Sequence, residues 1–221
     1  MITFDGVTKA YETGSGRKQV LKNASCCFEA GHNVGVLGAN GAGKSTLLRL
    51  IAGAEPPDSG QIRRAARVSF PLGFTGVFHP HLTGRQNATF VGRVYGADVR
   101  RVVSFVEEFA ELDAYFDMPI QTYSAGMNAR LAFGVSLAID FDVYLVDEVI
   151  EVGDARFRQK CADVLEQRMS RSDLIMVSHN TDTIRMYCDA GAVLFGGEIL
   201  FFDSIEEALA SYRDLTEASL G

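Results

Sequence analysis

Residues 38–46 combine glycines, a lysine and hydroxyl side chains in an order that suits phosphate binding. The segment reads Gly38-Ala39-Asn40-Gly41-Ala42-Gly43-Lys44-Ser45-Thr46, which fits the pattern of a glycine, four residues and then Gly-Lys-Ser. Glycines at 38, 41 and 43 are expected to adopt positive φ and turn backbone N–H groups toward an anion, and Lys44 adds a charge for the outer phosphates. Ser45 would ligate Mg²⁺. The alternative is a glycine-rich turn that binds nothing.

The sequence on either side of this loop predicts a strand before it and a helix after it. Residues 34–37 form a short run suited to a buried strand, and residues 45–52 place four apolar side chains on one side of a helix. The loop would then join a strand to the positive N-terminus of a helix, which attracts phosphate. This context favours nucleotide binding over an empty turn.

A pair of acids, Asp147 and Glu148, follows the apolar residues 141–146. Two acids at the end of a strand are usually a solvated terminus. Here they come about 100 residues after the phosphate loop, where a nucleotide-hydrolysing enzyme needs one carboxylate for Mg²⁺ and one for the attacking water. We therefore assign Asp147 to the metal, together with Ser45, and Glu148 to catalysis.

A third segment, Tyr123-Ser124-Ala125-Gly126-Met127, is predicted to open a helix. Ser124 and Gly126 could present a hydroxyl and backbone N–H groups to an anion. Equally, Ser124 could be an ordinary N-cap, which satisfies the first N–H groups of its own helix. The residues alone leave both readings open.

The composition limits the classes of protein to consider. Of the 221 residues, 47% are hydrophobic and 22% charged, and the net charge is −7, so the chain is globular and a nucleic-acid surface is not expected. No apolar run reaches the roughly 18 to 20 residues needed to span a bilayer, and the N-terminus lacks a secretory signal. The four cysteines have no metal-type spacing and are predicted to be free cytosolic thiols.

Strand and helix patterns alternate along the chain and predict an α/β fold with a mixed or parallel core sheet. Short β-like runs at residues 2–4 and 24–28 predict a small antiparallel β layer beside it. Residues 84–138 read as a helical insert, with Thr83 and Gln86 at capping-box spacing. Residues 193–195 and 198–202 predict a hairpin. A single domain is expected over residues 1–221.

In this order, the three segments resemble the ATP-binding subunit of ABC transporters. Residues 38–46 are similar to the Walker A motif of that family, and residues 123–127 to its signature motif, usually Leu-Ser-Gly-Gly-Gln. Asp147 and Glu148 resemble the end of Walker B and the catalytic base. The likeness covers the whole chain and implies the fold of a P-loop ABC ATPase.

The resemblance implies roles for three further residues. Asp154 matches the D-loop aspartate, although it could merely cap the following helix. His179 matches the switch histidine that stabilises the γ-phosphate, although it could be structural. Tyr11 matches the aromatic residue that stacks on adenine, although it could be a surface aromatic. The implied cofactors are ATP and Mg²⁺.

The resemblance also implies partners. Two copies would form a homodimer, in which Ser124 and Gly126 of one chain face the phosphates held by Lys44 of the other. A separate integral-membrane permease would carry the cargo, which places the chain at the cytoplasmic face of the inner membrane. Residues 72–83 are unusually apolar for a linker, and we expect them to contact that permease unless they pack inward.

One departure from the general family pattern narrows the branch. Most ABC subunits carry a glutamine at the position of Phe74, whereas residues 70–87 here resemble the polysaccharide-export branch, most closely the capsule exporter of Gram-negative bacteria. The implied function is ATP hydrolysis for export of a capsular or other cell-surface polysaccharide. Ser204 and Glu207 are predicted to open a last helix. Related O-antigen exporters often append a carbohydrate-binding domain, which we do not expect after that helix.

Four alternatives are weighed against this reading. They are the ATPase of an O-antigen or teichoic acid exporter, a soluble ABC ATPase of DNA repair or ribosomes, an importer ATPase and a small-molecule kinase. Soluble ABC ATPases carry coiled coils or a second cassette, and importers keep the glutamine that Phe74 replaces. A kinase would have no use for Ser124 or His179.

Overall fold

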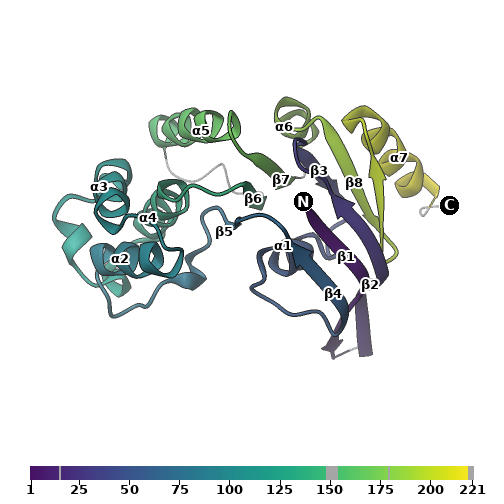
Figure 1. Cartoon of the computed structure of the whole chain (residues 1–221), viewed down its shortest axis with the longest axis horizontal. Coiled ribbons are helices and arrows are strands. Elements are labelled where there is room, and N and C mark those ends of the chain that lie inside the picture. The colour runs from purple at the N-terminus through teal and green to yellow at the C-terminus, as the bar shows by residue number, and fades with distance from the viewer. Residues whose placement is uncertain (15, 148–153, 179, 219–221) are drawn as a thin grey trace. The chain divides into compact units, whose positions relative to one another are not determined.

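The computed structural model describes residues 1–14, 16–147, 154–178 and 180–218 (Figure 1). The predicted residues Glu148 and His179 lie outside this part of the chain. The chain divides into two compact units. The first comprises Met1–Ser69, Asp142–Glu148 and Ser172–Gly221, and the second comprises Phe70–Phe141 and Val149–Arg171.

The first unit contains the predicted antiparallel layer as a three-stranded sheet. Its strands are β1 (Ile2–Thr13), β2 (Gly16–Phe28) and β4 (Ser59–Arg64), in the order β2-β1-β4. The strands are much longer than the expected runs at residues 2–4 and 24–28, which corrects that prediction. Most of β2 before Ala24 is exposed and polar, so its pairing with β1 leaves no hydrophobic pattern in the sequence.

The second sheet has six strands, and two of them, β6 and β7, end at residues of the candidate site described below. Its order is β5 (Val68–Pro71), β6 (Val143–Asp147), β7 (Asp173–Val177), β3 (Val34–Leu37), β8 (Ala190–Phe195) and β9 (Glu198–Phe202). β6, β7, β3 and β8 pair in parallel, whereas β8 and β9 form the predicted antiparallel hairpin. The mixed core sheet of the α/β prediction is therefore confirmed.

Helix α1 (Lys44–Ala52) packs in the core of the first unit. Its apolar side chains, Leu47, Leu48, Leu50 and Ile51, are fully buried against residues of both sheets. Arg64 of β4 donates to the carbonyl oxygens of Leu50 and Ile51, which satisfies the C-terminus of the helix. The burial of these side chains and the hydrogen bonds from Arg64 hold α1 in place. They thereby also fix the position of the phosphate loop that precedes the helix.

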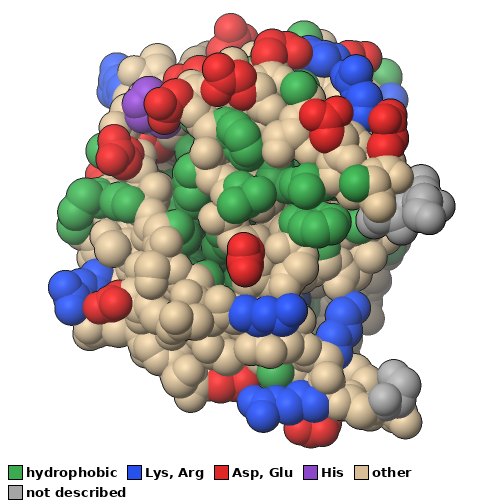
Figure 2. All heavy atoms as spheres, turned by 90° about the vertical axis from the view of Figure 1, so that its right-hand side faces the viewer, with side chains coloured by type: hydrophobic (Ala, Val, Ile, Leu, Met, Phe, Trp, Pro, Cys, Tyr) green, Lys and Arg blue, Asp and Glu red, His purple; other side chains and the backbone are tan. Residues whose placement is uncertain are grey.

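Helix α7 (Ile205–Ala218) lies against β3 and β8, and helix α6 (Thr181–Tyr187) packs beside α7 and approaches β3. Gly35 allows this approach, because a Cβ there would lie 2.7 Å from Cγ2 of Ile184 and 3.0 Å from Cδ1 of Ile205. Figure 2 shows the side of the molecule on which α7 lies in Figure 1, where apolar side chains gather across the middle of the face. Phe195 and Leu200 of the β8–β9 hairpin are among the partly exposed apolar residues.

The second unit is helical. It contains α2 (Gly84–Val94), α3 (Val99–Ala110), α4 (Ala125–Ala138) and α5 (Ala155–Met169). The capping box of Thr83 and Gln86 is present, and Asp98 caps α3. α2 to α4 span the expected insert, and the unit also includes residues 70–83 and α5, whose Phe157 ring lies 5.4 Å from that of Phe109. The single domain over residues 1–221 stays a prediction.

No helix among the described residues is long and apolar enough to cross a lipid bilayer.

Candidate functional site

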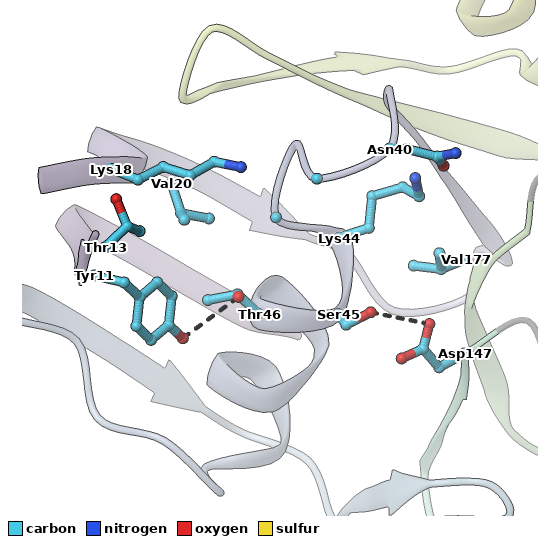
Figure 3. A pocket seen from close by; sticks show the side chains of 12 residues that line it. Tyr11, Thr13, Lys18, Val20, Asn40, Lys44, Ser45, Thr46, Asp147 and Val177 are labelled. Carbon is cyan, nitrogen blue, oxygen red and sulfur yellow. Dashed lines mark hydrogen bonds between the residues drawn. The ribbon is translucent and has the colours of Figure 1, made fainter. Parts of the chain in front are cut away.

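The first unit contains a cavity of about 370 Å³ around the phosphate loop (Figure 3). Its walls come from the loop and the start of α1, from one face of the β1–β2 hairpin, and from the ends of β6 and β7. The lining residues are Tyr11, Thr13, Lys18, Val20, Asn40, Gly41, Gly43, Lys44, Ser45, Thr46, Asp147 and Val177.

The phosphate loop adopts the expected left-handed turns at two of its three glycines. Gly41 has φ 75° and Gly43 has φ 111°, conformations that glycine adopts at little cost. Gly38 does not have positive φ, which corrects the prediction for that residue. Glycine is needed at 38 because a Cβ there would lie 2.9 Å from the carbonyl oxygen of Leu194.

The start of α1 is open to an anion. Gly43 is the N-cap and supplies no side-chain hydrogen bond, so the first N–H groups of the helix are left for a ligand. Val20 of β2 packs directly on this turn, because a Cβ at Gly43 would lie only 2.0 Å from its Cγ1. The β1–β2 hairpin therefore holds the loop from outside.

Lys44 is buried, and its ammonium group stays within the loop. The Nζ donates to the carbonyl oxygen of Gly38 at 2.7 Å and to that of Ala39 at 3.3 Å. These bonds hold a positive charge beside the N-terminus of α1. Asn40 and Thr46 also line the cavity, whereas Ala42 of the predicted loop is not a lining residue.

The structure brings Ser45 and Asp147 together from distant parts of the chain. The Ser45 hydroxyl donates to Oδ1 of Asp147 at 3.4 Å (Figure 3), because α1 begins beside the end of β6. A hydroxyl oxygen and a carboxylate oxygen are ligands that Mg²⁺ prefers. These two side chains therefore fit a magnesium ion.

Tyr11 forms another part of the cavity wall, and its ring is anchored at the hydroxyl end. The hydroxyl donates to Oε1 of Glu55 at 2.6 Å, and Arg49 donates to the Tyr11 oxygen at 3.3 Å. Burial opposes ionisation of Glu55, but hydrogen bonds from Tyr11, Lys9 and Arg49 outweigh it and lower the pKa of that carboxyl to about 2. The Tyr11 ring is therefore fixed in position by the hydrogen bonds of its hydroxyl group and is not an isolated surface side chain.

Ser124 and Gly126 belong to the second unit and do not line the cavity. Ser124 is the N-cap of α4, and its Oγ accepts from the N–H of Met127 at 3.2 Å. Gly126 lies in the first turn, and a Cβ there would meet only the Ser124 hydroxyl, at 3.9 Å. The capping alternative is thus realised, while the first turn of α4 remains exposed.

Asp154 also belongs to the second unit. It caps α5 by accepting from the N–H of Phe157 at 2.9 Å, and Arg130 of α4 donates to its other oxygen at 2.9 Å. The N–H of Phe157 and the charge of Arg130 both lower the pKa of the Asp154 carboxyl. Its capping role coexists with any role in nucleotide turnover.

Sequence reasoning missed four of the lining residues, namely Thr13, Lys18, Val20 and Val177. Three of them lie on the β1–β2 hairpin, where Lys18 pairs with Tyr11 and Thr13 pairs with Gly16. Side chains two residues apart share one face of a strand. If the pairing of Lys18 with Tyr11 had been known, this alternation would have predicted that Thr13, Lys18 and Val20 lie on the same face as Tyr11.

Known proteins match both the chain and its fold. Residues 21–151 match the ABC transporter family. The polysialic acid transport ATP-binding protein KpsT of Escherichia coli is 48% identical over 216 residues, which cover 96% of this chain and 99% of KpsT. The capsule polysaccharide export ATP-binding protein CtrD of Neisseria meningitidis serogroup B is 47% identical over 216 residues, 97% of this chain and 100% of CtrD.

A solved structure agrees with the fold. The ATP-binding cassette MJ0796, a dimer in a post-hydrolysis state bound to ADP and Pi, has a TM-score of 0.74 and 21% identity, and the match covers 90% of this chain and 96% of that one. At this identity the likeness shows the fold alone. The family match over residues 21–151 and the full-length identity to KpsT together identify the chain as an ATP-binding, ATP-hydrolysing member of the ABC transporter family.

Proposed function

We propose that this chain is the ATP-hydrolysing subunit of an exporter that moves a capsular or other cell-surface polysaccharide across the inner membrane. The observation that carries this proposal is the 48% identity to KpsT over nearly the full length of both chains. The printed name of KpsT assigns it to polysialic acid transport. Phe74, in place of the usual glutamine, agrees with the same branch.

The cavity supports a specific placement of the nucleotide. The phosphates would sit at the open N-terminus of α1, beside the Lys44 ammonium group, and Tyr11 would stack on the adenine. Ser45 and Asp147 would hold Mg²⁺, which neutralises phosphate charge when it is bound. The backbone of residues 38–43 would supply N–H groups, and its glycines at 38, 41 and 43 carry no side chain that could block the approach.

Turnover needs groups beyond the described residues that line the cavity. We assign Glu148 as the residue that orients or deprotonates the attacking water, and His179 as the residue that stabilises the γ-phosphate. Both lie outside the described residues, so the assignment rests on their positions after β6 and β7 in the sequence. Asp147 is the last residue of β6 and lines the cavity, and Glu148 follows it directly in the sequence.

A homodimer would complete the site. Ser124 and Gly126 are exposed at the first turn of α4, where a partner chain can reach them, and neither lines the cavity of its own chain. We assign them to the γ-phosphate held by Lys44 of the second copy. Closure of the dimer would then require an intact triphosphate, and hydrolysis would release it.

The cargo would be handled mainly by an integral-membrane permease, which would hold this chain at the cytoplasmic face of the inner membrane. Residues 72–83 are the proposed contact. Within them Phe74 is 41% exposed, whereas Leu72 is buried, so part of this segment packs inward and part faces outward. The runner-up function, an ATPase of an O-antigen or teichoic acid exporter, would use the same site with a different permease.

The function is tested by complementation and by hydrolysis. In a Gram-negative strain that lacks its own capsule-exporter ATPase, this chain is expected to restore surface capsule, and Glu148→Gln is not. The purified variant should bind ATP but hydrolyse it at least about 100-fold more slowly, since it loses a general base. Restoration of O-antigen export without capsule would instead support the runner-up.

A further inference from the structure

A second lysine points at the phosphate loop from outside. Lys18 extends from β2 toward the loop, and its Nζ approaches the loop from the side opposite to that of Lys44 (Figure 3). A Cβ built at Gly41 would lie 3.2 Å from the Lys18 Nζ. The ammonium group is therefore close to the backbone whose N–H groups are expected to surround phosphate.

The hairpin fixes the direction of this side chain. Lys18 pairs with Tyr11 across β1 and β2, so the two side chains share one face of the sheet. Thr13 and Val20, each two residues along a strand, lie on the same face and also line the cavity. The Thr13 hydroxyl donates to the Gly16 carbonyl oxygen, which ties the end of the hairpin just before Lys18.

The charge of Lys18 has no partner within the described part of the chain. No hydrogen bond or ion pair joins it to any described residue, whereas Lys44 is bonded to two loop carbonyls. Lys9, further along the hairpin, is paired with Glu55 and Asp58. Among these lysines, Lys18 is thus the cation whose N–H groups are left for a ligand of the cavity.

We propose that Lys18 binds the phosphate chain of the nucleotide as a second cation, from the β2 side of the loop. The inference rests on the proposed nucleotide placement and adds a residue to it. An ammonium group that donates to a phosphate oxygen forms a charge-assisted hydrogen bond. Because Lys18 is exposed, dissolved salt should screen this contact more than the buried contact of Lys44.

The experiment compares two ligands on four proteins. ATP and inorganic tripolyphosphate, which has no base, are titrated calorimetrically into the wild type, Lys18→Met, Lys18→Arg and Arg17→Met. Arg17 is the matched control, because Arg17→Met removes the same charge at the neighbouring position of β2, which lies opposite Glu12 in the strand register and is not among the residues that line the cavity. Circular dichroism checks that each variant is folded.

Lys18→Met should weaken both ligands by about tenfold, which corresponds to about 1.4 kcal/mol. Lys18→Arg should bind within about twofold of the wild type, as should Arg17→Met. The loss in Lys18→Met should shrink as the salt concentration rises, because the exposed contact is then screened in the wild type.

Two results would overturn the role of Lys18 alone. One is wild-type affinity for ATP in Lys18→Met, and the other is a loss for ATP without a loss for tripolyphosphate, which would place Lys18 on the base or the sugar. If the wild type binds neither ligand, the proposed nucleotide site fails, and the role of Lys18 fails with it. The wild-type titration therefore separates the two failures.

Discussion

The Tyr11 hydroxyl donates a hydrogen bond of 2.6 Å to the Glu55 carboxylate, which fixes the polar end of the ring that forms one wall of the cavity. Glu55 also pairs with Lys9 at 2.9 Å and with Arg49 at 3.1 Å. Arg49 in turn donates to the Thr46 hydroxyl at 3.1 Å. The aromatic wall and the phosphate loop are therefore joined by one network of charged hydrogen bonds.

This network separates the effects of two Tyr11 variants. Tyr11→Phe removes a hydrogen bond to a charged group, so the free energy of unfolding should fall by about 1.5 kcal/mol while ATP affinity stays nearly unchanged. Tyr11→Ala should also weaken ATP binding by about 1 kcal/mol, since it removes the aromatic ring. Urea unfolding and calorimetric titration measure the two quantities. Equal losses of ATP affinity in both variants would indicate that the hydroxyl contacts the nucleotide.

Glu55 should make stability depend on pH in the acidic range. Its pKa is about 2 in the folded protein, below the ordinary 4.5, so ionised Glu55 stabilises the fold above pH 4.5, and this contribution is lost as the pH falls toward 2. The wild type should exceed Glu55→Gln by about 2 kcal/mol at pH 6, and the gap should narrow below pH 4.5. A gap that is constant from pH 6 to pH 3 would contradict this role.

Asp154 can be tested against another helix cap of the same unit. Asp154→Ala and Asp98→Ala each remove a capping carboxylate, so each should lower the free energy of unfolding by about 1 kcal/mol. Only Asp154→Ala should also reduce ATP hydrolysis, because only Asp154 is assigned to the nucleotide site. Steady-state hydrolysis by the two purified variants decides the matter: equal rates would leave Asp154 with a purely structural role.

The proposed permease contact is tested by two charge substitutions in one segment. Phe74→Asp should leave the protein folded and able to bind ATP, since Phe74 is 41% exposed, but it should abolish co-purification with the permease. Leu72→Asp, at a position that is 3% exposed, should unfold the protein or cost several kcal/mol. Thermal melting and affinity purification measure these outcomes. A folded Phe74→Asp variant that still co-purifies and supports export would remove this segment from the interface.

Features that depend on neighbours in the chain could be predicted from the sequence. The phosphate loop is a pattern of nine consecutive residues. The capping box of Thr83 and Gln86 and the N-caps Asp98 and Asp154 each satisfy backbone groups within a few residues. The apolar runs of β3, β6 and β7 are nearly continuous because these strands are buried on both faces. Such signals give the α/β fold, the order of the elements and the core of the nucleotide site.

Features that depend on strand pairing and packing were decided only by the tertiary structure. Val20 meets Gly43, Leu194 meets Gly38, and Lys18 approaches Gly41, although these partners are separated by 23 residues or more in the sequence. The polar first half of β2 carries no hydrophobic pattern that reveals its register with β1. Successive side chains of a strand point to opposite faces, so a shift of the register by one residue would turn Lys18 away from the phosphate loop. The pairing of Lys18 with Tyr11 in the folded structure is therefore what places the Lys18 ammonium group beside that loop.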